Sequence, residues 1–299
     1  MANLKEVRDR ISSIKSTMQI TKAMKMVSAA KLRRAQQAIV QMRPYSVKQN
    51  QMLSNIVSNL SGDVDVEFAK ERTENSVLIV VVTSNRGLCG AFNSFVCKEA
   101  VKLVEKYDAQ RKAGNLSMTF IGKKGYDYFK NRYKDVNFIT DDMLLFSDLS
   151  FANTATVAQG LMSDFEGNKY DKIEVTYGEF KNAAVQNFKA EQFLPIQKVE
   201  ADAAEGEEQS GEKALFIFEP SAEELLEHMV PSILKTQFHK YLLDTHASEH
   251  GARMTAMDKA TENADELLKE LKIDYNKARQ EAITKEISEI VGGVAALEG

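Results

Sequence analysis

The chain has 299 residues, of which 43% are hydrophobic and 27% are charged, and its formal net charge is −4. This composition suits one or two folded domains and argues against nucleic acid as a main partner, because neutralising phosphates requires a basic excess. No apolar run approaches the roughly 20 residues that span a bilayer, and the N-terminal segment has no secretory apolar core, so we expect an intracellular chain that is soluble by itself.

The first sixty residues predict one α-helix, or two collinear helices, over residues 4–60. Asn3 and Glu6 form a capping pattern at its start. Pro44 is the only proline in this segment, and we expect it to cause at most a kink. Apolar residues recur at the 3-4 spacing of a coiled-coil seam, first at Leu4, Val7, Ile11, Ile14 and Met18, and later at Ala35, Ile39, Met42, Leu53, Ile56 and Leu60.

Residues 61–219 predict a central α/β domain. The run SVLIVVV at 76–82 is typical of a buried strand, and a loop with Gly87 and Gly90 follows it. Because strands and helices then alternate, we expect a partly parallel, Rossmann-like sheet with a late antiparallel part. The expected helices cover 93–112, 124–132 and 151–166, the further strands cover 118–121, 136–139, 172–177, 186–192 and 215–218, and an acidic flexible loop covers 198–213.

Residues 220–299 predict a second long helix, from 222 to 297. Ser221 and Glu224 form a capping box at its start. Pro231 either kinks this helix or opens a longer one, and Gly251 weakens it. Apolar residues step by seven at Met257, Ala264, Leu271 and Ala278, with Ala260 and Leu267 expected between them, and after a small shift the pattern continues at Ile283, Ile287, Ile290 and Val294.

Because both long helices leave the same domain, the simplest arrangement is an antiparallel coiled coil. Paired from its base, the second helix is longer by about 19 residues and overhangs the first by about 28 Å. The overhang begins near Arg279, and its apolar stripe at Ile287, Ile290 and Val294 has no partner within the chain. Such stripes usually mark a protein interface, so the sequence predicts a partner around this end.

Residues 22–34 place Met24 among basic residues that include Lys31, Arg33 and Arg34. Two interpretations stay open. The segment is either a solvated helix face, on which long basic side chains cover apolar neighbours, or a basic collar that faces acidic loops of a partner.

Four segments at both ends and in the middle of the chain carry a resemblance to a known family. They are ITKAMKMVSAAKLRRAQ at 20–36, TSNRGLCGAFN at 83–93, ASEHGARMTAMDKAT at 247–261 and YNKARQEAITKEISEIVGG at 275–293. Their order and spacing closely resemble the gamma subunit of F-type ATP synthase, over essentially the whole chain.

The resemblance implies a central rotor shaft inside a hexamer of alpha and beta subunits, with the α/β domain as a foot that contacts the epsilon subunit and the ring of c subunits. It implies no catalytic residue, cofactor or metal in this chain, since the family's chemistry takes place in the beta subunits. Matched by position, the subunit contacts are Met24, Lys31, Arg33, Arg34, Arg279, Gln280, Thr284, Ile287, Ile290 and Val294. The start of the chain shows no organelle transit segment, which favours a peripheral bacterial subunit on the cytoplasmic face of the inner membrane.

Other interpretations compete with this one. The glycine loop after strand 76–82 resembles a phosphate-binding junction, but RGLCGAF fits neither nucleotide-binding motif, and a glycine turn for close packing is the simpler explanation. A structural coiled-coil adaptor that does not rotate would use the same residues as a rotating shaft. Cys89 and Cys97 have no metal-ligand spacing, and we expect small buried hydrophobic side chains.

The segment from His246 to His250 matches the H-x-x-E-H pattern of one class of zinc protease, with Glu249 as the acid. Two histidines four residues apart on a helix can share one metal ion. No third ligand is evident from the spacing, so we expect these residues to lie on an ordinary exposed helix face.

Overall fold

The computed structural model describes residues 4–59, 68, 70, 72–196 and 222–298. The chain divides into two compact units. One unit combines Met1–Ala29 with Arg253–Gly299, and the other comprises Ala30–Ala252. We describe the two units separately.

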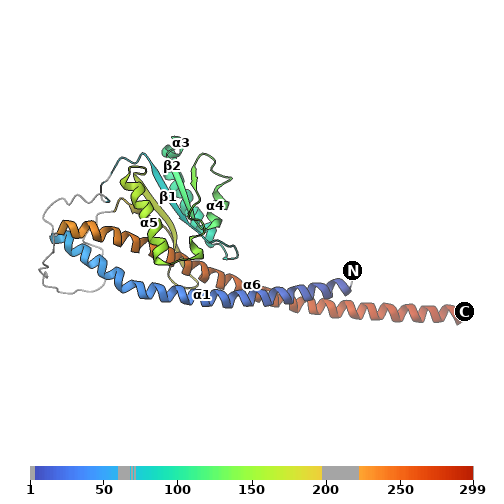
Figure 1. Cartoon of the computed structure of the whole chain (residues 1–299). Coiled ribbons are helices and arrows are strands. Elements are labelled where there is room, and N and C mark those ends of the chain that lie inside the picture. Colours follow the sequence, from blue (N-terminus) through green and yellow to red (C-terminus); the bar gives the residue numbers. More distant parts are fainter. Residues whose placement is uncertain (1–3, 60–67, 69, 71, 197–221, 299) are drawn as a thin grey trace. The chain divides into compact units, whose positions relative to one another are not determined.

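The two long helices are confirmed. Helix α1 covers Leu4–Asn59 and helix α6 covers Ala222–Glu298 (Figure 1). Pro44 lies inside α1 and Pro231 lies inside α6, so neither proline ends its helix. Leu60 and Ser221, at the expected boundaries, lie outside the described residues.

In the first unit, the predicted seam of α1 is confirmed, because Leu4, Val7, Ile11, Ile14 and Met18 are all buried or half-buried. On α6 the residues that step by seven also face inward. The seam residues between these positions lie one residue later in the chain than the sequence predicts. Leu268 is 5% exposed whereas Leu267 is 41% exposed, and Thr261 takes the place expected for Ala260 by bonding to α1.

The second unit contains a five-stranded sheet in the order β3-β2-β1-β4-β5. Strands β1 (Val77–Val82), β2 (Leu116–Ile121), β3 (Asn137–Ile139) and β4 (Lys172–Phe180) are parallel, and β5 (Gln186–Leu194) pairs antiparallel with β4. The predicted parallel sheet with a late antiparallel part is therefore confirmed. The expected strand 215–218 and the acidic segment 198–213 lie outside the described residues.

The sheet has helices on both faces because its central strand is apolar on both sides. Val77, Ile79 and Val81 face α2 (Phe92–Lys106) and α4 (Lys123–Phe129). Leu78 and Val80 face α5 (Phe151–Glu166) and the part of α6 between residues 230 and 242 (Figure 1). Both cysteines lie in the first of these cores and are buried, as predicted.

The single helix expected over 93–112 is wrong. Helix α2 ends at Lys106 and a short helix α3 covers Asp108–Lys112. Tyr107 lies between them with φ −102° and ψ 34°, outside helical geometry. Its ring is buried, and its hydroxyl donates a hydrogen bond to the carboxylate of Glu174 on β4. Tertiary packing of Tyr107 therefore accompanies a helix break that periodicity does not reveal.

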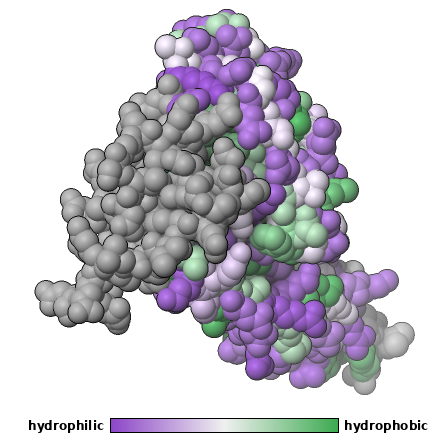
Figure 2. Space-filling model, turned by 60° about the vertical axis from the view of Figure 1, so that its left-hand side comes forward, coloured by the Kyte–Doolittle hydropathy of each residue, from purple (hydrophilic) through white to green (hydrophobic). Residues whose placement is uncertain are grey.

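The outer surface of the described residues is mostly polar in the view of Figure 2, with small hydrophobic areas between the hydrophilic ones. No described helix is both long enough and apolar enough to cross a membrane.

A 3-10 turn over Leu145–Ser147 precedes α5 and supplies Phe146 to the sheet face that α6 covers.

Candidate subunit interface on the long helices

Polar pairs fix how the helices of the first unit align. The hydroxyls of Thr21 and Thr261 lie 2.7 Å apart, and Lys25 forms an ion pair with Asp258. Since residue numbers rise along one helix and fall along the other, the pairing is antiparallel. Continuing this register places Leu4 beside Ala278, so the predicted start of the overhang near Arg279 agrees with the structure.

Residues of α6 are no longer buried once the helix extends past Leu4, the first residue of α1. Ala278 and Ala282 are half-buried, whereas the residues from Ile283 to Val294 are all exposed. Ile287, Ile290 and Val294 are 56%, 66% and 51% exposed. An apolar stripe of this length on an otherwise polar helix end is the kind of surface that a protein partner covers.

Polar predicted contacts accompany this stripe. Arg279, Gln280 and Thr284 are exposed, and the Thr284 hydroxyl donates to the backbone carbonyl of Gln280 at 2.9 Å. This bond lies within the helix and uses only the backbone of Gln280.

The part of α1 that pairs with Asp258 and Thr261, away from the overhang, carries apolar residues that the seam pattern does not use. Ile20, Met26 and Val27 are about 60% exposed, at 60%, 61% and 58%, while the predicted contact Met24 is half-buried. Sequence reasoning did not single out Ile20. Its large apolar side chain at a position outside the seam was the signal that could have identified it.

The basic residues of α1 lie in the second unit. Lys31, Arg33 and Arg34 are exposed, and Leu32 and Ala35 between and beside them are buried. The structure shows no ion pair from Lys31, Arg33 or Arg34 to a residue in the described ranges. The segment therefore presents three basic side chains on the outer surface of α1.

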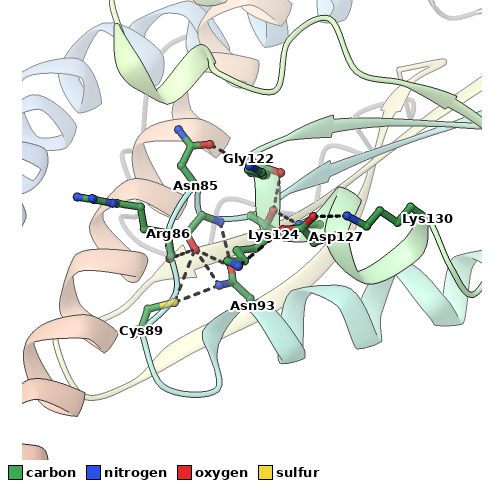
Figure 3. Close-up of polar contacts among 12 residues, drawn as sticks. Asn85, Arg86, Cys89, Asn93, Gly122, Lys124, Asp127 and Lys130 are labelled. Carbon is green, nitrogen blue, oxygen red and sulfur yellow. Dashed lines mark hydrogen bonds and ion pairs between the residues drawn. The ribbon is translucent and has the colours of Figure 1, made fainter.

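The glycine loop that follows β1 holds itself together through polar contacts. The Asn93 side chain lies beside Cys89 (Figure 3), and its amide donates to the Cys89 sulfur at 3.2 Å and to the Ser84 hydroxyl at 2.8 Å. Its carbonyl oxygen accepts from the Ser84 backbone amide at 3.0 Å. These contacts support the packing explanation, because the polar groups at this junction bind one another.

The start of α4 is tied to the same loop. The Lys123 amide donates to the Asn85 side chain at 3.2 Å, and the Gly125 amide donates to the Thr83 hydroxyl at 2.8 Å. Amides at the first turn of a helix are the groups that would bind a phosphate. Here they serve as donors to the β1 loop.

A buried histidine links α6 to α5 in the second unit. His239 Nδ1 lies 2.8 Å from the Thr154 hydroxyl, which itself donates to the Phe151 carbonyl at 3.0 Å. Thr154 has one hydroxyl hydrogen, so it accepts from Nδ1 in the His239 tautomer that carries the N–H there. Burial lowers the pKa of His239 below its ordinary value of 6.5, so the folded chain holds a neutral ring.

We expect His239 to make the chain less stable in acid. Above the ordinary pKa the ring is neutral in both states, whereas at lower pH only the unfolded chain takes up the proton. The free energy of unfolding therefore falls as the pH drops below about 6.5. Urea unfolding between pH 7.5 and pH 5 should show a smaller decline in His239→Asn, whose side-chain amide can still donate to Thr154. Equal declines in both proteins would contradict this expectation.

Together, the fold and the exposed helix end define a class of protein. It is a chain whose two long helices flank an α/β domain in the sequence, pair in antiparallel sense in the first unit and leave an apolar helix end exposed.

Comparison with known proteins specifies the class further. A family described as ATP synthase matches residues 3–297. An ATP synthase gamma chain from Flavobacterium psychrophilum is 50% identical over all of both chains, and one from Cytophaga hutchinsonii is 51% identical over 99% of both chains. The chain belongs to the ATP synthase gamma chain family.

Solved structures agree with the fold. A chain in the mitochondrial ATP synthase of Euglena gracilis superimposes with a TM-score of 0.64 at 23% identity, over 98% of this chain and 94% of that one. A chain in the central stalk and c-ring structure from Tetrahymena thermophila gives a TM-score of 0.55 at 22% identity, over 81% of this chain and 99% of that one.

Proposed function

We propose that this chain is the central rotor shaft of an F-type ATP synthase and couples ion-driven rotation of a membrane ring to ATP synthesis or hydrolysis in the beta subunits. Its full-length similarity to ATP synthase gamma chains supports the assignment. The single structural observation that carries it is the exposed apolar end of α6, where Ile287, Ile290 and Val294 have no partner within the described part of the first unit.

The proposed partners are those that the similarity to ATP synthase gamma chains suggests for each of the two units. The alpha and beta subunits would surround the paired helices and cover the apolar end of α6. The epsilon subunit and the ring of c subunits would bind the α/β domain. The chain itself is proposed to be non-catalytic and to lie at the cytoplasmic face of the bacterial inner membrane, attached only through the complex.

The coupling follows from symmetry. A single asymmetric shaft cannot present the same surface to three identical partners, so it stabilises a different conformation in each. Each orientation shifts a partner's equilibrium only by the difference in contact free energy between that partner's states. Because such coupling is reciprocal, nucleotide turnover can turn the shaft, and turning the shaft can release product.

A double substitution tests the apolar end. We expect Ile287→Asp with Ile290→Asp to weaken assembly with alpha and beta subunits about tenfold or more, because two carboxylates would replace apolar contacts. The isolated chain should unfold at the same urea concentration as the unmodified chain, since both side chains are exposed. Titrating the chain into alpha and beta subunits and recording the yield of complex and its ATP hydrolysis measures both effects.

Lys285 offers a matched control on the opposite side of the same helix turns. Lys285→Asp changes the net charge by the same two units as the double substitution, and it should leave assembly nearly unchanged. Equal loss with both variants would mean that charge, rather than the apolar stripe, controls assembly.

The adaptor alternative predicts a different outcome. An adaptor would assemble with the alpha and beta subunits without imposing rotation on them. Attaching a visible probe to the α/β domain of the reconstituted complex distinguishes the two functions, because a shaft turns in steps during ATP hydrolysis and an adaptor does not.

A further inference from the structure

The paired histidines of α6 do not lie on the exposed helix face that the sequence predicts. His250 is 5% exposed and His246 is half-buried. The His246 ring stacks on Phe146 with an interplanar angle of 16°. That expectation was wrong because periodicity does not show that residues 145–147 cover this side of α6.

The two rings direct the same nitrogen toward one another. Nε2 of His246 and Nε2 of His250 lie 3.1 Å apart, and the ring planes are nearly perpendicular, at 89°. Residues four apart on a helix share one face, so the helix itself sets this convergence. Both residues lie in the second unit, in a part of α6 where the backbone is continuous helix.

This separation is close to what a shared metal ion requires. Zinc binds imidazole nitrogens at about 2.0–2.1 Å with tetrahedral angles, which places two such nitrogens about 3.3 Å apart. The observed spacing differs from this value by a few tenths of an ångström, a difference that small ring rotations can supply. An ion would replace the hydrogen that the two nitrogens now share, once each Nε2 presents its lone pair.

We propose that His246 and His250 form a binding site for one divalent transition-metal ion of the zinc or nickel type. Among the described residues, no group of three or more His, Cys, Asp or Glu side chains is placed to hold an ion. Solvent would therefore complete the coordination, and the ion would enter from the side of the half-buried His246. The ion would join two successive turns of α6 beside Phe146 and stabilise the folded chain.

The test titrates the full chain with ZnCl2 and, separately, with NiCl2, by calorimetry and by thermal unfolding. We expect saturable binding of one ion per chain and a higher unfolding temperature with either metal. His246→Asn should weaken binding at least about tenfold. This variant should fold, because His246 is half-buried rather than fully buried, and circular dichroism without metal checks this directly.

His239→Asn is the matched control, since it removes another histidine of α6 that binds Thr154 instead. It should bind metal as the unmodified chain does. The proposal is overturned if the unmodified chain binds neither metal saturably, if His246→Asn binds as tightly as the unmodified chain, or if His239→Asn loses binding to the same extent.

Discussion

Gly122→Ala should lower the free energy of unfolding by roughly 4 kcal/mol or more, the largest effect we expect from a single substitution in this chain. Gly122 precedes α4 and has a φ of +100°, a backbone conformation that is strained for any residue other than glycine. A Cβ at this position would also overlap the backbone carbonyl of Thr83. Because Thr83 directly follows β1 and its amide bonds to the Ile121 carbonyl of β2, relief would require moving the end of a strand of the core.

Gly114→Ala separates the two causes. Gly114 also has a positive φ, of +77°, but a Cβ there would meet no atom within 4 Å. We expect a loss of only about 1 kcal/mol. Urea unfolding of both variants measures the difference, and equal losses would show that the close approach to Thr83 contributes nothing.

Tyr107→Phe should cost about 2 kcal/mol of stability, because it removes a buried hydrogen bond to a carboxylate. Glu174 is buried, and it would keep only the ion pair from Lys106, at 2.9 Å. Burial and then the bond to Glu174 raise the pKa of Tyr107 well above its ordinary value. The hydroxyl therefore stays protonated and donates throughout the pH range in which the chain folds.

Tyr170→Phe is the control for ring burial. Tyr170 is similarly buried, and no described residue accepts a hydrogen bond from its hydroxyl, so its stability should change little. Combining Tyr107→Phe with Glu174→Gln should cost less than the two single losses added together, since the partners act as one unit. Simple additivity would contradict a coupling between Tyr107 and Glu174 of β4.

Residue periodicity predicts most of this architecture because the long elements follow one repeat each. The boundaries of α1, β1 and α5 agree with prediction to within about one residue, as is usual where a strong pattern meets clear end signals. The break at Tyr107 does not follow from local pattern, and it accompanies a hydrogen bond to a carboxylate on a strand far along the chain.

The seam of the coiled coil shows a second limit. A seven-residue step from Ala260 selects Leu267, but Leu268 is buried and Thr261 bonds to α1. A threonine pair can occupy a seam when each hydroxyl finds a partner, and a search for apolar residues alone passes over it. The exposed stripe near Ile287 was predictable, since it needs only the lengths of the two helices. Its contacts with other subunits stay a prediction.

The polar pairs of the first unit oppose sliding of α1 along α6. Apolar seam residues of similar size allow one helix to shift along the other by one heptad, because each side chain can pack between equivalent residues of the facing helix. A shift by seven residues would place Thr21 opposite Leu268, and its hydroxyl would lose the hydrogen bond to Thr261. A coiled coil that transmits torque must keep its two helices in one register. Here the threonine–threonine hydrogen bond and the adjacent lysine–aspartate ion pair favour that register.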